Sequence, residues 1–364
     1  TETLLGQFTP ASGDQRLIAR YNKVSAEARS RFSFTPALTD QARKNRAITV
    51  VIRARDDESS VARTAALAAG KHLLAEKPFG IDQTACGQIM AMVRDVPNRL
   101  VRCSSEFPFF PGAQKIVAMA AAGKMGRILE ARCGLLHSSD LDHLKPINWK
   151  RQARFNGEYG CMGDLGLHAA HVPLRLGWRP RDVRAMLTKV VPQRPDRAGE
   201  GATLVPCDTW DNALLACMVG DAREHEFPLL LEMKRIAPGH TNTWFLEIDG
   251  TELSARFSTR WPRTLETLPY SRGRPQSRHV QDLGYESAYP AITGAIFEFG
   301  FPDAIQQMLA AFCDELVHGR AGMRQPFCCA TPGEAADTHA VFTAALASSR
   351  DSATVRIEYP ATGP

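Results

Sequence analysis

The chain has 364 residues, is 44% hydrophobic, 23% charged and 8% aromatic, and carries a net charge of +5. This length allows two domains with sizeable cores, and the composition is that of an ordinary globular protein. The basic residues are scattered among acidic and apolar ones, so we expect no nucleic-acid-binding surface. No apolar run is long enough to span a bilayer and no signal-peptide pattern is visible, so we expect a cytoplasmic protein without membrane contact.

The first part of the chain alternates short apolar runs with helix-like stretches. The expected strands are residues 16–21, 47–52, 72–75 and 100–103. The expected helices between them are residues 25–32, 59–69 and 82–93. The run 47–52 is continuous and β-branched, as in a parallel strand buried on both faces. This rhythm predicts a doubly wound parallel sheet.

After Pro111 the pattern changes to a series of strands separated by turns. The expected strands are residues 127–133, 182–189, 210–218, 229–235, 243–248 and 253–257. Because turns rather than helices join them, we expect a mainly antiparallel sheet. Four helices are expected in this half, at residues 113–122, 163–176, 302–317 and 331–348. Residues 190–206 and 271–284 are expected to be loops.

The nine cysteines show no regular spacing and no C-x-x-C motif. Two of them, Cys328 and Cys329, are adjacent, which is a poor start for a disulfide framework. This usage is typical of reduced thiols in a cytoplasmic protein. No cysteine has zinc spacing to a pair of histidines, so we expect no metal site.

A lysine follows the expected strand 72–75, in the sequence Glu76-Lys77-Pro78. This position is the carboxyl end of a sheet strand, where open α/β sheets bind their ligands. The bond before proline also allows a cis peptide, which would aim the lysine differently from an ordinary turn. The alternative interpretation is a solvated lysine in a turn.

A carboxylate and an imidazole are four residues apart in the expected helix 163–176. Asp164 and His168 therefore share one helix face. An aspartate held against a histidine fixes its tautomer and stabilises its protonated form, as proton transfer requires. The alternative is a core histidine with its own carboxylate partner, and His171 is a weaker candidate because it falls on another face.

Together these motifs resemble the glucose–fructose oxidoreductase/inositol dehydrogenase (Gfo/Idh/MocA) family. The resemblance covers most of the chain. The stretches that carry it are Ala69-Gly70-Lys71-His72 before Glu76-Lys77-Pro78, Gly123 to Glu130, Trp149-Lys150, and Asp164-Leu-Gly166-Leu-His168. Each stretch alone is common, whereas their order and spacing together are specific.

The resemblance implies a two-domain α/β fold. Residues 1–110 would form a Rossmann-like dinucleotide-binding domain, here apparently without its first strand and Gly-rich loop. Residues 111–364 would form an α+β domain for substrate binding and oligomerisation, built on a large, open, mainly antiparallel sheet. A late helix is expected to pack back on the first domain, and the family pattern implies a homodimer or homotetramer.

The family's activity is NAD(P)-dependent oxidation or reduction of a sugar, inositol or related cyclic polyol. Lys77, Asp164 and His168 match its catalytic positions. By this analogy His168 takes the hydroxyl proton as hydride leaves carbon, and Lys77 hydrogen-bonds the same oxygen; which of the two is the base varies in the family. The expected substrate contacts are Lys77, Arg151, Asp164 and His168, with His143 and Trp244 as weaker candidates.

The cofactor half departs from the family pattern. The sequence contains no G-x-G-x-x-G motif. Asn22-Lys23 stands where an acidic residue would bind the ribose of NAD, which slightly favours NADP. The residues expected near the cofactor are Asn22, Lys23, Arg53, Glu76, Lys77, Pro78, Glu106, Trp149 and Lys150.

Three functions fit this pattern. The first is an active dehydrogenase, with its Gly-rich loop missing through truncation of the chain. The second is a non-catalytic sugar-sensing or regulatory protein in which cofactor binding is impaired. The third is a lyase or epimerase that uses transient hydride transfer.

Overall fold

The structure is a computed structural model that describes residues 48–50, 63, 66–68, 70–220, 225–284, 286–291, 296–325 and 327–360. The expected strand 16–21, the expected helix 25–32 and the candidate cofactor residues Asn22, Lys23 and Arg53 lie outside these residues. Within the described ranges, no helix has the length and apolarity needed to cross a bilayer. The same ranges contain no cluster of His, Cys, Asp and Glu side chains suited to a metal ion.

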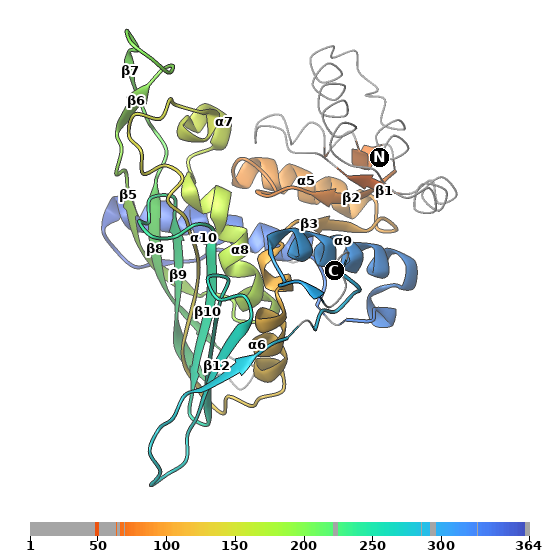
Figure 1. Cartoon of the computed structure of the whole chain (residues 1–364). Coiled ribbons are helices and arrows are strands. Elements are labelled where there is room, and N and C mark those ends of the chain that lie inside the picture. Colours follow the sequence, from red (N-terminus) through yellow and green to blue (C-terminus); the bar gives the residue numbers. More distant parts are fainter. Residues whose placement is uncertain are drawn as a thin grey trace.

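A small parallel sheet forms the first part of the described fold (Figure 1). Its strands, in the order β1-β2-β3, are β1 (Ile48–Val50), β2 (His72–Ala75) and β3 (Val101–Cys103). Helix α5 (Gln83–Asp95) connects β2 to β3 and begins at Asp82, whose Oδ1 accepts a hydrogen bond of 2.7 Å from Ala85 N. This β-α-β arrangement confirms the parallel α/β unit predicted from the alternating pattern.

The second sheet has nine strands in the order β13-β12-β11-β10-β4-β9-β8-β5-β14. Their bounds are β4 (Ile128–Leu136), β5 (Asp182–Thr188), β8 (Asn212–Gly220), β9 (Glu226–Lys234), β10 (Thr243–Gly250), β11 (Leu253–Ser258), β12 (Thr264–Pro269), β13 (His279–Asp282) and β14 (Val355–Arg356). The β4–β9 pair is parallel and the other neighbouring pairs are antiparallel. The prediction of a mainly antiparallel sheet is therefore confirmed.

Two stretches expected to be loops contain strands. Within 190–206 a short hairpin is formed by β6 (Gln193–Pro195) and β7 (Leu204–Pro206). Within 271–284 lies β13, an edge strand whose residues are all exposed. β6 and β7 have only three residues each and β13 has no buried face, so neither segment shows a recognisable strand pattern in sequence.

Helices connect the two sheets. They are η1 (Phe107–Phe109), α6 (Pro111–Ala121), η2 (Trp149–Arg151), α7 (Ala153–Asn156), α8 (Cys161–Arg175), α9 (Phe301–His318), η4 (Arg320–Gly322) and α10 (Pro332–Asp351). Helix α8 packs on β4 and β9, while α10 packs on β5, α8 and α5. Figure 1 shows α8 beside the large sheet, with α5 and the small sheet beyond it. Helix α10 therefore contacts elements of both sheets.

The close approach of α8 and α10 depends on Gly166. A Cβ at this position would lie 2.1 Å from Cζ of Phe342, well inside van der Waals contact. Phe342 is buried in the main core together with side chains of the large sheet. Glycine therefore lets α8, which carries Asp164 and His168, pack tightly against α10.

An ion pair also joins α8 to α10. Arg175 Nε lies 2.5 Å from Glu334 Oε1, and its Nη2 donates to Glu334 Oε2 over 2.7 Å. Burial alone would raise the pKa of Glu334, but the hydrogen bonds and the charge of Arg175 outweigh it and hold the pKa at about 2. The pair therefore contributes stability above the ordinary glutamate pKa, and this contribution is lost as the pH falls toward 2.

The Glu334→Gln variant is expected to lose about 3 kcal/mol of unfolding free energy at neutral pH, because Arg175 keeps its charge in a largely buried place. As the pH falls from 4.5 to 2, Glu334 becomes protonated first in the unfolded protein and then in the folded protein. The difference in unfolding free energy between Glu334→Gln and wild type should therefore vanish over this range. Urea denaturation of both proteins across this range measures it. A constant difference down to pH 2 would contradict the assignment.

Candidate active site

Lys77 lies directly beyond the carboxyl end of β2, as the sequence predicted. The Lys77–Pro78 peptide bond is cis. The loop that carries it is held by Arg63, a buried side chain that donates 2.9 Å to the carbonyl of Phe79 and 2.5 Å to that of Glu76. Arg63 was not among the residues predicted from the sequence. Its place in an Ala-rich stretch that was expected to form a helix packed on the sheet is the signal that could have indicated a buried, loop-holding arginine.

Asp164 lies in the first turn of α8. The helix begins after Gly160, which has φ +57° and lies so close to Trp210 that a Cβ would be 2.5 Å from its backbone nitrogen. An acidic residue in the first turn is favoured by the partial positive charge of the helix N-terminus. The backbone therefore places the carboxylate of Asp164 at a buried helix start.

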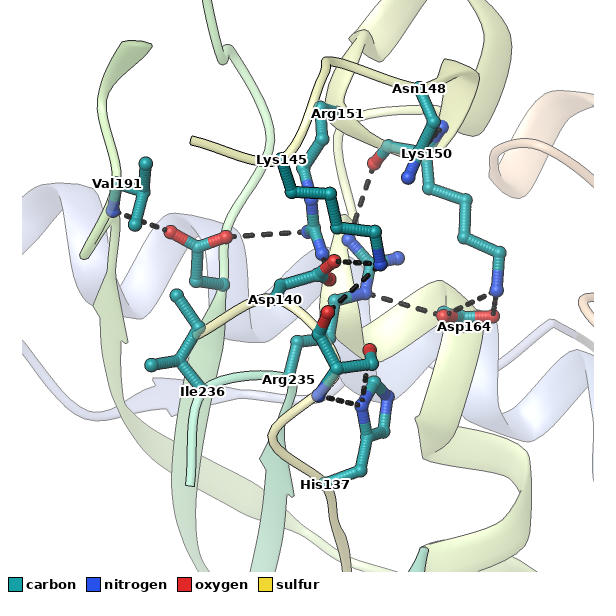
Figure 2. A network of polar contacts seen from close by, with 12 residues as sticks. His137, Asp140, Lys145, Asn148, Lys150, Arg151, Asp164, Val191, Arg235 and Ile236 are labelled. Atoms are coloured by element: carbon teal, nitrogen blue, oxygen red, sulfur yellow. Dashed lines mark hydrogen bonds and ion pairs between the residues drawn. The ribbon is translucent and has the colours of Figure 1, made fainter. Parts of the chain in front are cut away.

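Three cationic side chains converge on the Asp164 carboxylate. Lys77 Nζ lies 2.6 Å from Oδ1 and also donates to the Asp164 carbonyl oxygen. Lys150 Nζ lies 2.8 Å from both Oδ1 and Oδ2, and Arg235 Nε lies 3.3 Å from Oδ2. Figure 2 shows Lys150 and Arg235 reaching the carboxylate from two sides.

The charge state of Asp164 follows from these contacts. Burial would raise the pKa of the carboxyl, but the positive charges of Lys77, Lys150 and Arg235 lower it well below its usual range. The carboxylate is therefore ionised at neutral pH. It acts as a shared counter-ion that draws Lys77 from the small sheet and Lys150 from η2 to the same point.

His168 has other neighbours than the sequence predicted. Its Nδ1 lies 3.4 Å from Ser105 Oγ and 3.9 Å from Glu106 Oε2, and its ring meets that of Phe107 edge to face. In place of the expected pairing of Asp164 with His168, the side-chain hydrogen bonds of Asp164 within the described ranges come from lysine and arginine. Hydrogen bonds from the charged lysine and arginine groups stabilise a buried carboxylate more strongly than a hydrogen bond from a neutral imidazole would.

Glu106, expected near a cofactor phosphate, thus lies beside the candidate base. It follows β3, as Lys77 follows β2, so the carboxyl ends of two adjacent parallel strands supply both residues. Ser104 and Ser105 precede it and are buried. The structure brings Lys77, Asp164, His168 and Glu106 into one region.

Trp149, Lys150 and Arg151 form the η2 turn, which Asn148 caps by accepting a 2.9 Å hydrogen bond from Lys150 N. Lys150 points to Asp164, but Arg151 is only 1% exposed and pairs with Asp140 and Asp211. Arg151 therefore belongs to a neighbouring buried network (Figure 2) and not to an accessible substrate surface.

The two weaker candidates for substrate contacts, Trp244 and His143, also lie apart from the Asp164 cluster. Trp244 lies in β10 and is fully buried. Its Nε1 donates a hydrogen bond of 2.8 Å to the carbonyl oxygen of His168, so Trp244 stabilises the position of α8 and is not a substrate contact. His143 lies on an exposed part of the loop between β4 and η2.

Sequence reasoning also missed His137, which directly follows β4. Its Nδ1 lies 2.8 Å from Ser139 Oγ. Burial and the charges of Arg235, Lys150 and Arg151 outweigh the opposite effect of Asp164 and lower the pKa of His137 to about 4. His137 is therefore a neutral hydrogen-bonding group at neutral pH, near the Asp164 cluster.

The described residues fit the nicotinamide end of a dinucleotide. Parallel strands β2 and β3 end side by side at Lys77 and at Ser104-Ser105-Glu106, the edge at which such sheets bind ligands. The Ser104 hydroxyl is buried and finds no hydrogen-bond partner among the described residues. Such a group is suited to a polar atom of a ligand.

No family model matches the chain. In sequence it is 26% identical over 267 residues to the levoglucosan dehydrogenase of Pseudarthrobacter phenanthrenivorans. The matched stretch covers 68% of this chain and 66% of that enzyme, slightly less than two thirds of the enzyme's length.

Solved structures share the fold. A levoglucosan dehydrogenase in complex with NADH and levoglucosan has a TM-score of 0.73 at 22% identity, covering 93% of this chain and 89% of that one. An inositol dehydrogenase homolog from Azotobacter vinelandii, complexed with NAD⁺, has a TM-score of 0.69 at 19% identity, covering 87% and 80%. An oxidoreductase domain protein from Kribbella flavida has a TM-score of 0.73 at 20% identity, covering 84% and 79%.

These relatives confirm two predictions. They are dehydrogenases and oxidoreductases of the kind that the motifs indicated, so the resemblance to the Gfo/Idh/MocA family is confirmed. The predicted two-part fold, a Rossmann-type parallel sheet joined to a large mainly antiparallel sheet, is confirmed as well.

Proposed function

Starting from this family resemblance, we propose that the protein is an NAD(P)-dependent oxidoreductase that acts on a CH–OH group of a sugar, inositol or related cyclic polyol. The observation that carries the proposal is the convergence of Lys77 and Lys150 on Asp164 beside His168, next to the ends of β2 and β3. The levoglucosan dehydrogenase named above is solved in complex with NADH and levoglucosan, which supports the choice of substrate class.

A bound nicotinamide supplies the hydride acceptor for this reaction, and the protein supplies the proton chemistry. His168 takes the hydroxyl proton as the general base, a role that histidine side chains perform most often. The carboxylate of Glu106, 3.9 Å from Nδ1, stabilises the imidazolium that results. In this scheme Glu106 performs the task first expected of Asp164.

Lys77 donates a hydrogen bond to the same substrate oxygen. An ammonium has three N–H donors, and the described contacts of Lys77 to the Oδ1 and carbonyl oxygen of Asp164 use two of them. The third is available to the reacting hydroxyl. Asp164 thus orients Lys77 toward substrate, and it does the same for Lys150.

The cofactor is a nicotinamide dinucleotide, held at its reactive end by Lys77, Trp149, Lys150 and the Ser104–Glu106 segment. Complexes of the relatives contain NADH or NAD⁺. A slight preference for NADP, from Lys23, and assembly into a homodimer or homotetramer are further parts of the proposal. Separate titrations with NADH and NADPH, followed by nicotinamide fluorescence, and sedimentation of the full chain test them.

The second candidate is a sugar-sensing regulatory protein that keeps the site but binds cofactor weakly. The absence of a G-x-G-x-x-G motif from the sequence favours it. Binding of a polyol without measurable binding of either NADH or NADPH would support the regulator over the dehydrogenase.

The His168→Ala variant tests the enzyme assignment. Nicotinamide reduction by the wild-type chain is first measured over a panel that includes levoglucosan and myo-inositol. His168→Ala is then expected to lower kcat by about 10³-fold, the range of general base catalysis, with cofactor affinity unchanged. His279→Ala, at an exposed edge-strand position, is the matched control and should retain activity. Equal kcat values for His168→Ala and wild type would refute the role.

A further inference from the structure

We infer that Arg235 is a positioning residue that holds Asp164, and through it Lys77 and Lys150, in the reactive arrangement. This inference rests on the proposed function. Arg235 directly follows β9, far in sequence from both lysine motifs, and its side chain is fully buried. Nothing in the family resemblance assigns it a role.

The guanidinium joins three separate parts of the site. Its Nε donates to Asp164 Oδ2 at 3.3 Å, its Nη1 to the carbonyl of Lys150 at 3.2 Å, and its Nη2 to the carbonyl of Gly160 at 3.3 Å. These acceptors belong to the first turn of α8, to η2 and to Gly160, the residue that directly precedes α8. The N–H donors of a guanidinium are spread over a planar fork that reaches these three separated acceptors at once, whereas the three donors of an ammonium all diverge from a single nitrogen.

The backbone of Arg235 ties this cluster to the large sheet. Its N–H donates to the carbonyl of Asp211 at 3.0 Å, and Asp211 Oδ1 lies 3.3 Å from Arg151 in the adjacent buried network. The position of Arg235 is therefore fixed independently of the groups that it binds. Figure 2 shows Arg235 between this network and Asp164.

This geometry sets the direction of the Asp164 carboxylate. Lys150 bonds both oxygens and Lys77 bonds Oδ1, so rotation of the carboxylate would move both ammonium groups. Arg235 approaches Oδ2 from the protein interior and opposes that rotation. Because the lysine side chains are long and flexible, the third cation supplies the rigidity that they lack.

A purely structural arginine is the competing explanation, and Arg175 provides the matched control. Arg175 is also largely buried and donates to several acceptors, namely Glu334, Cys328 and Cys329. It lies at the end of α8, the helix that carries Asp164. It does not contact Asp164 in the described contacts. If buried arginines matter here only for stability, Arg235→Met and Arg175→Met should affect catalysis equally.

The first experiment compares kcat and KM of the full chain with its best polyol. Arg235→Met is expected to lower kcat about 10²-fold, as misplacement of reacting groups by about 1 Å does, with KM and cofactor affinity nearly unchanged. Arg235→Lys should recover only part of kcat, because it keeps the charge but not the fork. Arg175→Met should keep kcat within about threefold, within the usual spread of substitutions remote from a site. Equal losses in the two methionine variants would overturn the inference.

The second experiment needs no turnover. Reductive methylation of each lysine is followed by mass spectrometry, and Lys150, 25% exposed, is within reach of the reagent. In Arg235→Met its rate should change about tenfold, because the Asp164 carboxylate that binds Lys150 Nζ is no longer held by Arg235 and has lost one of its three cations, with no change in Arg175→Met. An unchanged rate at Lys150 would refute the positioning role, whereas a wild-type chain without turnover on any polyol would refute the proposed function alone.

Discussion

Replacing Lys77 by methionine is expected to lower kcat about 10³-fold, because the donor to the reacting oxygen is lost. The fold should be unaffected, since Asp164 keeps Lys150 and Arg235 as partners and methionine matches the length of the lysine stem. Steady-state kinetics with the best polyol and thermal unfolding of both proteins measure the two effects.

Lys71→Met is the matched control for this experiment. Lys71 precedes β2, so it stands at the other end of the same strand, away from the edge that carries Lys77. It should retain wild-type kcat. A Lys77→Met protein with full activity, or a Lys71→Met protein with an equal loss, would rule out a specific role for Lys77.

The largest effect on stability is expected at Asp164. Asp164→Asn removes the charge that Lys77, Lys150 and Arg235 share, and leaves three cations facing one another in a buried place. Removing one partner of a buried ion pair costs about 3–5 kcal/mol of unfolding free energy, and we expect a loss of that size here. Urea denaturation at neutral pH measures it.

A second substitution distinguishes lost charge balance from a general packing defect. Adding Lys150→Met to Asp164→Asn removes one of the uncompensated cations, so the double variant should be more stable than Asp164→Asn alone. Asp249→Asn, an exposed carboxylate on β10, should change stability little. Additive losses from Asp164→Asn and Lys150→Met would show that the two side chains are not coupled.

The sequence predicted most of the fold because its strong patterns are local. The β-branched run that contains β1, the alternating strands of the large sheet and the capped helix α5 all carry their own signal. Among the strands that were missed, β13 is exposed throughout and β14 has two residues, so neither carries such a signal. β13 extends the sheet beside the preceding strand β12, whereas β14 pairs with β5, which is far away in the chain.

For the candidate site, the sequence likewise indicated individual residues but not their contacts. The motifs predicted Lys77, Asp164 and His168, and Lys150 was expected nearby. The identity of their partners was not predictable, since Arg235 is 71 residues from Asp164. Glu106, which follows β3 of the small sheet, is likewise far in sequence from His168 in α8. Helical i,i+4 spacing suggested a bond between Asp164 and His168, but spacing gives only proximity, and charge decided which group the carboxylate binds.

We propose that hydride passes directly from a polyol carbon to a nicotinamide, while His168 takes the hydroxyl proton and Lys77, oriented by Asp164, hydrogen-bonds the same oxygen. The most direct test incubates the full chain with oxidised cofactor and a polyol that carries deuterium on the carbinol carbon, followed by mass spectrometry of the cofactor. We expect deuterium in the cofactor with the wild-type chain and a rate about 10³-fold lower with Lys77→Met. No deuterium from any polyol, or equal transfer by both proteins, would contradict the claim.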